Sequence, residues 1–266
     1  MERTKLKNIL INSLLFITLF FMGFIPVEEK KAEFKLRRIV IDAGHGGKDP
    51  GSIGRVSREK DVTLAIALKV GQYISDLLPD VEVIYTRETD VFIALKERAN
   101  IANRNRADLF VSIHCNSISS PNAYGTETYV MGSRNFNANF EIVKRENAVI
   151  LLEDDYQENY EGFDPNSPES YMMFNLMQKA YFANSLSLAA KIETDLANRV
   201  NRRSRGVKQA PFYVLWTTSM PSVLIETGFL SNPGEEKYLN SKSGQTYIAS
   251  GIFRAIKAYK EEIEAI

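Results

Sequence analysis

A short apolar run that ends at a glycine-flanked histidine constrains the fold of this chain more than any other feature. Residues 38–43 read RIVIDA, and the sequence GHGG that follows contains His45. His114, the other of the chain's two histidines, closes a similar run that begins at residue 108. Two β-rich segments that each carry an imidazole at the carboxyl end are typical of neighbouring strands in one sheet. We therefore expect both imidazoles at the same edge of that sheet.

Structural and ligand roles are both open for these histidines. A single histidine at the end of a strand is more often a structural residue than a metal ligand. However, the glycines on both sides of His45 leave its backbone free of side chains, as close approach by an ion or a substrate requires. If the two histidines bind a metal ion, carboxylates elsewhere in the chain are the expected partners.

The segments that follow the first run alternate between helix and strand. Apolar residues keep helical spacing from Glu59 to Pro79, where the helix should end. Residues 81–87 alternate like a strand, and residues 95–106 have the pattern of a helix that leads into the His114 strand. This β-α-β-α-β order predicts an α/β fold, with a mainly parallel mixed sheet covered by helices on both faces of a single domain.

Strand and helix patterns also continue through the C-terminal half of the chain. Strands are expected at residues 125–130, 212–215 and 222–226, and helices at residues 171–203 and from about residue 235 onward. The segment RRSR at residues 202–205, with its three arginines, and Gly206 are expected to end the first of these helices. Glu226 closes the last strand, in a position that repeats those of the two histidines.

Composition narrows the class of protein and of partner. The 266 residues, 44% of them hydrophobic, suffice for one substantial core. Lysines and arginines number 33, and aspartates and glutamates also number 33, so the charge balance gives no electrostatic case for a nucleic acid partner. Cys115, the only cysteine, cannot form an intramolecular disulfide, and we expect it to pack on the face opposite His114.

The first 30 residues differ from the rest of the chain. Three basic residues precede an uncharged run from residue 9 to residue 25, and a charged segment follows it. This layout predicts a signal peptide or an N-terminal membrane anchor in residues 1–30, with cleavage left open. We therefore expect an exported protein, in the periplasm or cell envelope, with residues 9–25 as the candidate anchor.

Residues 132–169 interrupt the alternation of elements. A short amphipathic segment comes first, and an acidic stretch rich in turn residues runs from residue 153 to residue 168. The second part has few apolar side chains to bury. It is therefore typical of an insertion between a strand and a helix rather than of a separate domain.

Four candidate residues collect at element ends on the same side of the predicted sheet. They are His45, Glu59, His114 and Glu226. Two imidazoles and one carboxylate leave a coordination position of zinc open for water, and a second carboxylate can take the proton. The spacing alone is a weak signal because the sequence lacks HExxH, and Glu59 by itself is better explained as a helix-start acid.

Four motifs carry a resemblance that is more specific than this spacing. They are VIDAGHGGKDPG at residues 40–51, EKD at 59–61, SIHCN at 112–116 and ETGFLSN at 226–232. In this order, they resemble the zinc-dependent N-acetylmuramoyl-L-alanine amidases of the amidase 3 (AmiC-like) family, and the likeness spans about residues 38–262. Cys115 departs from the family, which usually has alanine after the histidine.

The resemblance implies a fold like that of zinc-dependent phosphorylases and hydrolases, with a catalytic domain over residues 37–264. It implies one Zn²⁺ per chain, with His45, Glu59 and His114 as ligands and Glu226 as the general acid/base. The implied reaction is hydrolysis, by zinc-activated water, of the amide bond between N-acetylmuramic acid and the L-alanine of the peptidoglycan stem peptide. The implied roles are wall remodelling and daughter-cell separation.

The resemblance also bears on the insertion. Division amidases of this family are implied to carry a helical segment that blocks the zinc site until a protein activator displaces it. Residues 136–169 lie at the corresponding place, within the insertion at residues 132–169. Glu146 is therefore the candidate for an autoinhibitory acid at the open metal position. A solvated helix acid is an equally acceptable interpretation of Glu146.

Two other functions stay open at this point. A zinc peptidase that cuts within the stem peptide would use the same metal chemistry on the same peptidoglycan substrate. An inactive wall-binding regulator would be expected to lack a metal ligand or the acid, whereas this sequence has all four residues. Product analysis is needed to separate the amidase from the peptidase.

Overall fold

The computed structural model describes residues 34–176 and 180–265. The predicted leader, residues 1–30, lies outside the described residues. None of the described helices is long and apolar enough to cross a membrane. Residues from Lys35 onward form one compact unit.

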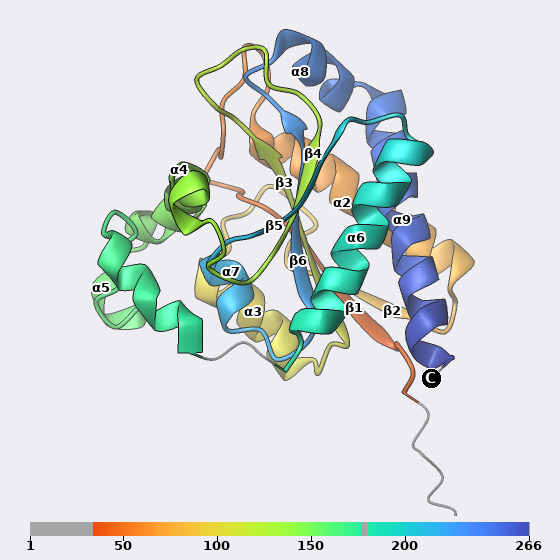
Figure 1. Cartoon of the computed structure of the whole chain (residues 1–266), viewed down its shortest axis with the longest axis horizontal. Helices are drawn as coiled ribbons and strands as arrows, with labels where there is room; N and C mark the ends of the chain where they lie inside the picture. The colour runs from red at the N-terminus through yellow and green to blue at the C-terminus, as the bar shows by residue number, and fades with distance from the viewer. Residues whose placement is uncertain (1–33, 177–179, 266) are drawn as a thin grey trace, which may run out of the picture. The chain divides into compact units, whose positions relative to one another are not determined.

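Six strands in the described residues form a single sheet. They are β1 (Arg38–Ala43), β2 (Glu82–Tyr85), β3 (Leu109–Asn116), β4 (Thr126–Val130), β5 (Ser204–Gln209) and β6 (Ser222–Phe229). Their order across the sheet is β2-β1-β3-β6-β4-β5 (Figure 1). All neighbours are parallel except β4 and β6, which are antiparallel. The expected mainly parallel mixed sheet is therefore confirmed.

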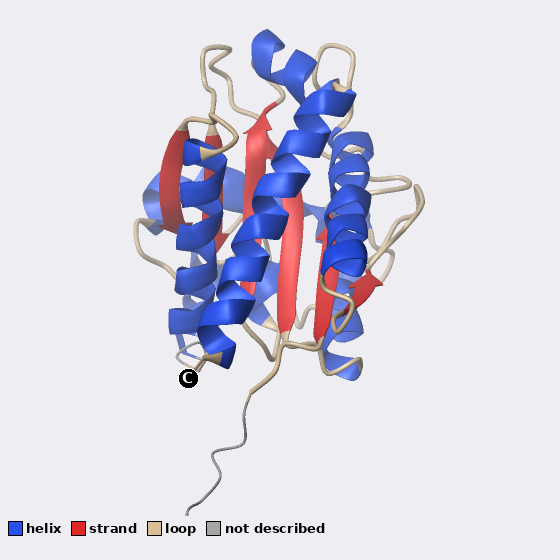
Figure 2. Cartoon of the chain, turned by 90° about the vertical axis from the view of Figure 1, so that its right-hand side faces the viewer, coloured by secondary structure: helices blue, strands red, loops and turns tan. Residues whose placement is uncertain are grey.

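Helices cover both faces of this sheet. They are α2 (Glu59–Leu77), α3 (Leu95–Arg104), α4 (Phe136–Asn147), α5 (Tyr156–Asn159), α6 (Phe182–Asn198), α7 (Tyr213–Trp216), α8 (Pro233–Asn240) and α9 (Lys242–Glu264), with 3₁₀ helices at Ala148–Leu152 and Pro168–Leu176. In Figure 1, α2, α6 and α9 lie on one side of the sheet, and α3, α4, α5 and α7 lie on the other. Figure 2 views the first side, where long helices pass in front of the strands.

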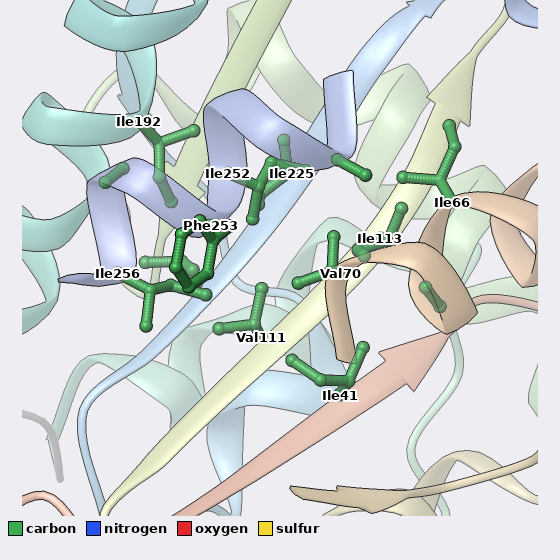
Figure 3. Packing of buried hydrophobic residues seen from close by; sticks show 14 of the residues in the cluster. Ile41, Ile66, Val70, Val111, Ile113, Ile192, Ile225, Ile252, Phe253 and Ile256 are labelled. Atoms are coloured by element: carbon green, nitrogen blue, oxygen red, sulfur yellow. The ribbon is translucent and has the colours of Figure 1, made fainter. Parts of the chain in front are cut away.

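Strand alternation divides the buried core into two clusters. Ile41 and Val111 pack with apolar residues of α2, α6 and α9, as Figure 3 shows. Val40 and Phe110 belong to the other cluster, with residues of α3, α4 and α7. Successive side chains of a strand point to opposite faces, so each buried strand supplies both clusters. This explains why the central strands β1, β3 and β6 are apolar on both faces.

The same alternation positions the candidate site. His114 lies four residues after Phe110, and Glu226 lies two residues after Leu224, so both face the side of the second cluster. Cys115 is fully buried in the first cluster, as the sequence predicted. The two candidate side chains therefore share a face that the thiol does not.

One strand prediction for the C-terminal half is wrong, and one strand was not predicted. Residues 212–215, expected as a strand, lie at α7, and the strand of this region is β5 instead. β5 is an edge strand whose side chains are exposed or only partly buried, so it lacks the apolar alternation of a half-buried strand. At α7, the Tyr213 amide donates to Asn147 Oδ1 over 2.8 Å. This contact with α4 is invisible in the local sequence.

Helix boundaries also differ from those expected. α6 runs from Phe182 to Asn198, whereas the sequence predicted one helix over residues 171–203. The C-terminal segment forms two helices because the chain is extended at Ser241, whose side chain accepts a hydrogen bond from the Gly244 amide. Such caps are local polar contacts, which apolar periodicity does not reveal.

The first core cluster generates a stability prediction. Ile252 of α9 is fully buried between that helix and the sheet (Figure 3), so Ile252→Ala should lower the free energy of unfolding by about 2 to 5 kcal/mol. Urea unfolding followed by circular dichroism would measure the loss. Val56→Ala is the matched control, because Val56 is 85% exposed and its loss should cost no more than about 0.5 kcal/mol. Equal effects of the two substitutions would contradict the assigned core.

Candidate metal centre

His45 lies in the loop that follows β1. Its backbone is in the left-handed region, with φ of 61°, which non-glycine residues adopt infrequently. Gly46 follows with φ of 129°, and a Cβ at that position would collide with the carbonyl oxygen of Val91. Position 46 therefore needs a glycine, because only a residue without a Cβ fits this close to the Val91 backbone.

Glu59 is the first residue of α2 and is fully buried. Its Oε2 accepts a hydrogen bond from the Ser52 amide, and its Oε1 accepts one from the Cys115 amide, each over 2.8 Å. A carboxylate is also favoured at the start of a helix, where the backbone dipole is positive. The acid is therefore anchored both to the loop before α2 and to β3.

Four buried side chains from four elements converge at one point. They are His45, Glu59, His114 and Glu146, and each offers one ligand atom within 4.8 Å of the others. His45 Nε2 lies 3.2 Å from Glu59 Oε1 and 3.2 Å from Glu146 Oε2. His114 Nδ1 lies 3.1 Å and 3.0 Å from the same two oxygens. The structure thus brings the three predicted ligands together, and adds the acid from α4.

The donor set of this cluster fits a zinc ion. Imidazole nitrogens and carboxylate oxygens are both zinc ligands in proteins. His45 Nε2 and Glu146 Oε2 are buried, and neither makes a hydrogen bond. Leaving such polar atoms without a partner in the interior is costly, so a cation between them would relieve a cost that the fold otherwise bears.

Asp49 fixes the orientation of His45, and it was not among the candidate site residues identified from the sequence. His45 Nδ1 donates to Asp49 Oδ2 over 2.7 Å, since an ionised carboxylate can only accept. Asp49 Oδ1 in turn accepts from the Gly51 amide over 3.0 Å. Carboxylate support of this kind is typical of metal-ligating histidines. Its position four residues after His45 in the glycine-rich loop is a signal that could have identified it.

Glu226 lies beside His114 on the neighbouring strand, and the two residues are in register. Glu226 is fully buried, and neither of its carboxylate oxygens has a hydrogen-bond partner. On the other side, Glu127 of β4 is in register with Glu226. Glu127, which sequence reasoning missed, accepts from Tyr129 over 2.6 Å and pairs with Lys208 over 2.7 Å. Only one of the two adjacent carboxylates is therefore neutralised.

Charge and burial shift the pKa values of these groups strongly. Burial, together with the carboxylates of Glu146 and Glu59, raises the pKa of Glu226 well above its ordinary value. For His114, burial acts to lower the pKa, but the Glu146 and Glu59 carboxylates outweigh it and raise the pKa to about 9. The pKa of His45 is likewise raised, despite burial, by Glu59 and by the hydrogen bond to Asp49.

Glu146 is 4% exposed and lies in the cluster, so it is not a solvated helix acid. Its Oε1 is paired with the neighbouring Arg145 over 2.9 Å. The Arg145 guanidinium also donates to the Ser117 carbonyl and to Asn116 Oδ1, in the segment where β3 ends. Two residues thus attach α4 to the site: Glu146 contacts the two histidines, and Arg145 binds the segment where β3 ends.

These shifts predict how the stability of the metal-free protein depends on pH. Because the pKa of His114 is about 9 in the folded chain and about 6.5 when unfolded, the folded state binds more protons between these values. The stabilisation is complete below pH 6.5 and is lost as the pH rises toward 9. The raised pKa of Glu226 acts in the same direction. Urea unfolding of chelator-treated protein from pH 6.5 to 9 should show this decrease.

His114→Gln supplies the control for this pH dependence. The variant lacks the titrating imidazole, so its unfolding free energy should decrease less over the same range. A stability of the parent protein that rises between pH 6.5 and 9 would contradict the pKa directions assigned to the cluster.

Comparisons with known proteins identify a family for this chain. Residues 39–258 match the sequence profile of the family described as N-acetylmuramoyl-L-alanine amidase. The N-acetylmuramoyl-L-alanine amidase AmiA of Escherichia coli K12 is 34% identical over 226 residues, which cover 84% of this chain and 76% of AmiA.

Two solved structures extend the likeness to the fold. An N-acetylmuramoyl-L-alanine amidase from Clostridium difficile 630 has a TM-score of 0.65 and 28% identity, over 86% of this chain and 98% of that one. The CwlD amidase from Clostridioides difficile, solved in complex with the GerS lipoprotein, has a TM-score of 0.63 and 28% identity, over 85% of this chain and 99% of that one. Because the family profile spans most of the chain, the protein belongs to the N-acetylmuramoyl-L-alanine amidase family of hydrolases.

Proposed function

We propose that this protein hydrolyses the amide bond between N-acetylmuramic acid and the L-alanine of the peptidoglycan stem peptide. One observation carries the proposal within the family assignment. A buried, unpaired carboxylate, that of Glu226, lies next to a cluster of imidazoles and carboxylates that can hold a metal ion. A metal site and an adjacent proton acceptor are the two parts that metal-assisted amide hydrolysis needs.

Zn²⁺ is the metal that we propose for this site, one per chain. His45 through Nε2, His114 through Nδ1 and Glu59 through Oε1 would hold it. The two nitrogens lie 3.2 Å and 3.1 Å from Glu59 Oε1, and the Cys115 amide fixes that oxygen. When bound, zinc would lower the pKa of water to about 7 and polarise the substrate carbonyl. Glu59 keeps its charge in this environment, since the neighbouring histidine helps to hold its pKa below the ordinary value despite burial.

Glu226 is the proposed general acid/base. It lies on the same face of the sheet as His114 and has no hydrogen-bond partner that would compete for its oxygens. Burial and the carboxylates of Glu146 and Glu59 raise its pKa above the ordinary value, so this carboxylate takes up a proton more readily than that of an exposed glutamate. The carboxylate would accept a proton from the attacking water and return it to the leaving amine nitrogen.

A digest of intact peptidoglycan tests this function. The purified chain with Zn²⁺ should release stem peptides that begin with a free L-alanine amino group, as detected by amino-terminal labelling and mass spectrometry. Glycan strands should keep an unsubstituted lactyl carboxylate. Release of peptides that lack L-alanine would identify the alternative, a peptidase that cuts within the stem.

Two controls separate catalysis from wall binding. A chelator should abolish release, and added Zn²⁺ should restore it. Glu226→Gln should reduce turnover by at least about 100-fold, as expected for loss of an acid/base group, while metal content stays stoichiometric. Loss of the metal from this variant would instead make Glu226 a ligand. Absence of any product from both the metal-loaded parent protein and its Glu146→Gln variant would favour an inactive wall-binding regulator.

We also propose that α4 is autoinhibitory, with the insertion over residues 132–169 as a regulatory segment of a catalytic domain at residues 37–264. Glu146 supports this, since its Oε2 lies among the proposed ligand atoms and would take the position that water needs. The next residue, Asn147, donates to the Pro211 carbonyl and accepts from the Tyr213 amide. Lys48 also donates to the Leu152 carbonyl, over 2.5 Å. Together these contacts would keep the helix over the site.

A segment held in this way needs a partner to release it. We propose a protein activator, and the complex of the similar CwlD amidase with the GerS lipoprotein is a precedent for a protein partner. The substrate lies outside the cytoplasmic membrane, so we further propose export to the periplasm or cell envelope, with residues 1–30 as signal peptide or anchor. Wall remodelling and daughter-cell separation are the proposed roles.

Glu146→Gln tests the inhibitory helix. Glutamine has nearly the same shape but is a weaker metal ligand, so basal release of stem peptides should rise several-fold without an activator. Glu141→Gln is the matched control, because Glu141 is exposed on the same helix and its loss should leave the rate unchanged. An unchanged rate in Glu146→Gln would contradict the inhibitory role of this acid.

A further inference from the structure

We infer that Arg98 is a positioning residue for His45, and this inference rests on the proposed role of His45 as a metal ligand. Arg98 lies on α3, in the second core cluster's layer, and its side chain does not touch the ligand atoms. It acts instead on the backbone from which the His45 ring projects.

The guanidinium of Arg98 is 1% exposed and bonded on all three nitrogens. Its Nη2 donates to the His45 carbonyl over 2.8 Å, and its Nη1 donates to the Ala43 carbonyl over 2.7 Å. Nη1 also donates to Asp42 Oδ1 over 2.8 Å, and Nε donates to the Ile93 carbonyl over 3.0 Å. One rigid group therefore joins the end of β1 to the loop carbonyl two residues later.

His45 needs such a hold because its own conformation is unfavourable. A left-handed φ of 61° in a residue with a side chain persists only where the surroundings fix it. The flanking glycines supply no side-chain contacts of their own, so they cannot restrain the loop by packing. The bond from Arg98 to the His45 carbonyl fixes the peptide plane at this point, and thereby the direction of the ring.

Asp42 holds the guanidinium in turn. It is fully buried, and its carboxylate also accepts from Thr86 Oγ1 over 2.7 Å and from Ser112 Oγ over 2.6 Å. The Asp42–Arg98 pair is thus tied to β3 and to the segment after β2. A buried ion pair contributes little net stability compared with apolar residues, so its position at the base of a strained ligand loop favours a geometric role.

Arg87 completes the restraint from the other side. It donates through Nε to the Ala43 carbonyl and through Nη2 to the carbonyls of Gly44 and Lys60. The carbonyls of residues 43, 44 and 45 are therefore all bonded to guanidinium groups, but only Arg98 reaches that of His45. This difference makes Arg98 the residue to substitute.

Lysine is the informative substitution at this position. It keeps the positive charge that Asp42 requires, but its single ammonium lacks the planar fork that spans the carboxylate and the His45 carbonyl together. Arg98→Lys should therefore weaken the hold on His45 without leaving a buried charge unpaired. Second-layer substitutions of this kind typically reduce metal affinity by about 10- to 100-fold.

The test measures metal binding and loop protection in the full-length chain. Competition with a chromophoric chelator should show a Zn²⁺ dissociation constant at least about 10-fold higher for Arg98→Lys. The Co²⁺-substituted variant should have an altered visible spectrum. In the metal-free variant, amide hydrogen exchange should be faster over residues 43–51, where the Gly46 amide donates to the Asp49 carbonyl. Ile252→Ala is the control for destabilisation alone, and should keep the parent affinity and spectrum.

A double variant separates positioning from charge pairing. Asp42→Asn with Arg98→Met leaves no unpaired charge, so it should be more stable than Arg98→Met alone, yet its Zn²⁺ affinity should stay low. Recovery of affinity together with stability would overturn the inference, as would parent-like affinity, spectrum and exchange in Arg98→Lys. Failure of the parent chain to bind Zn²⁺ would instead refute the proposed metal site, while the exchange of metal-free protein would still test the hold on His45.

Discussion

The structure depends on one constraint: two imidazoles and three carboxylates are buried together at one edge of a sheet. Burying charge costs free energy unless each group is paired or bonded. The chain meets this cost from several elements, since backbone amides hold Glu59, Asp49 holds His45, and Arg145 pairs with Glu146. The parallel order of β1, β3 and β6 brings these elements to the same edge. The strand order that forms the sheet therefore also assembles the site.

Glu127 and Glu226 lie side by side on the adjacent strands β4 and β6. They show how this arrangement gives two glutamates different chemical properties. Glu127 is paired with cations of β5 and accepts a hydrogen bond from Tyr129, and these contacts hold its pKa below the ordinary value despite burial. Glu226 has no such partner, and burial raises its pKa. The cations of β5 pair with Glu127 and leave Glu226 without a partner. The proposed mechanism needs such an unpaired carboxylate to accept and return a proton.

Helix α4, which approaches the site from outside, is packed into the core. α4 buries Ile142 and Val143 in the second core cluster, and Phe136 and Phe140 pack against Tyr171. Displacement of this helix would expose that apolar surface, at a cost that grows with the area uncovered. A partner that releases the site would therefore need to offer an apolar surface of its own, in addition to contacts that replace those of Arg145 and Asn147.

The sequence by itself determined the α/β class and the strand and helix order as far as β4, because apolar periodicity encodes them. Its local motifs also identified His45, Glu59, His114 and Glu226 as candidate site residues. It missed β5 and predicted a strand where α7 lies, since an edge strand and a short helix held by Asn147 have no apolar period of their own. Only the tertiary structure decided that Glu146 joins the cluster, that Asp49 and Arg98 hold His45, and that Glu127 is paired while Glu226 is not. Those outcomes depend on contacts between distant segments, which a local pattern cannot specify.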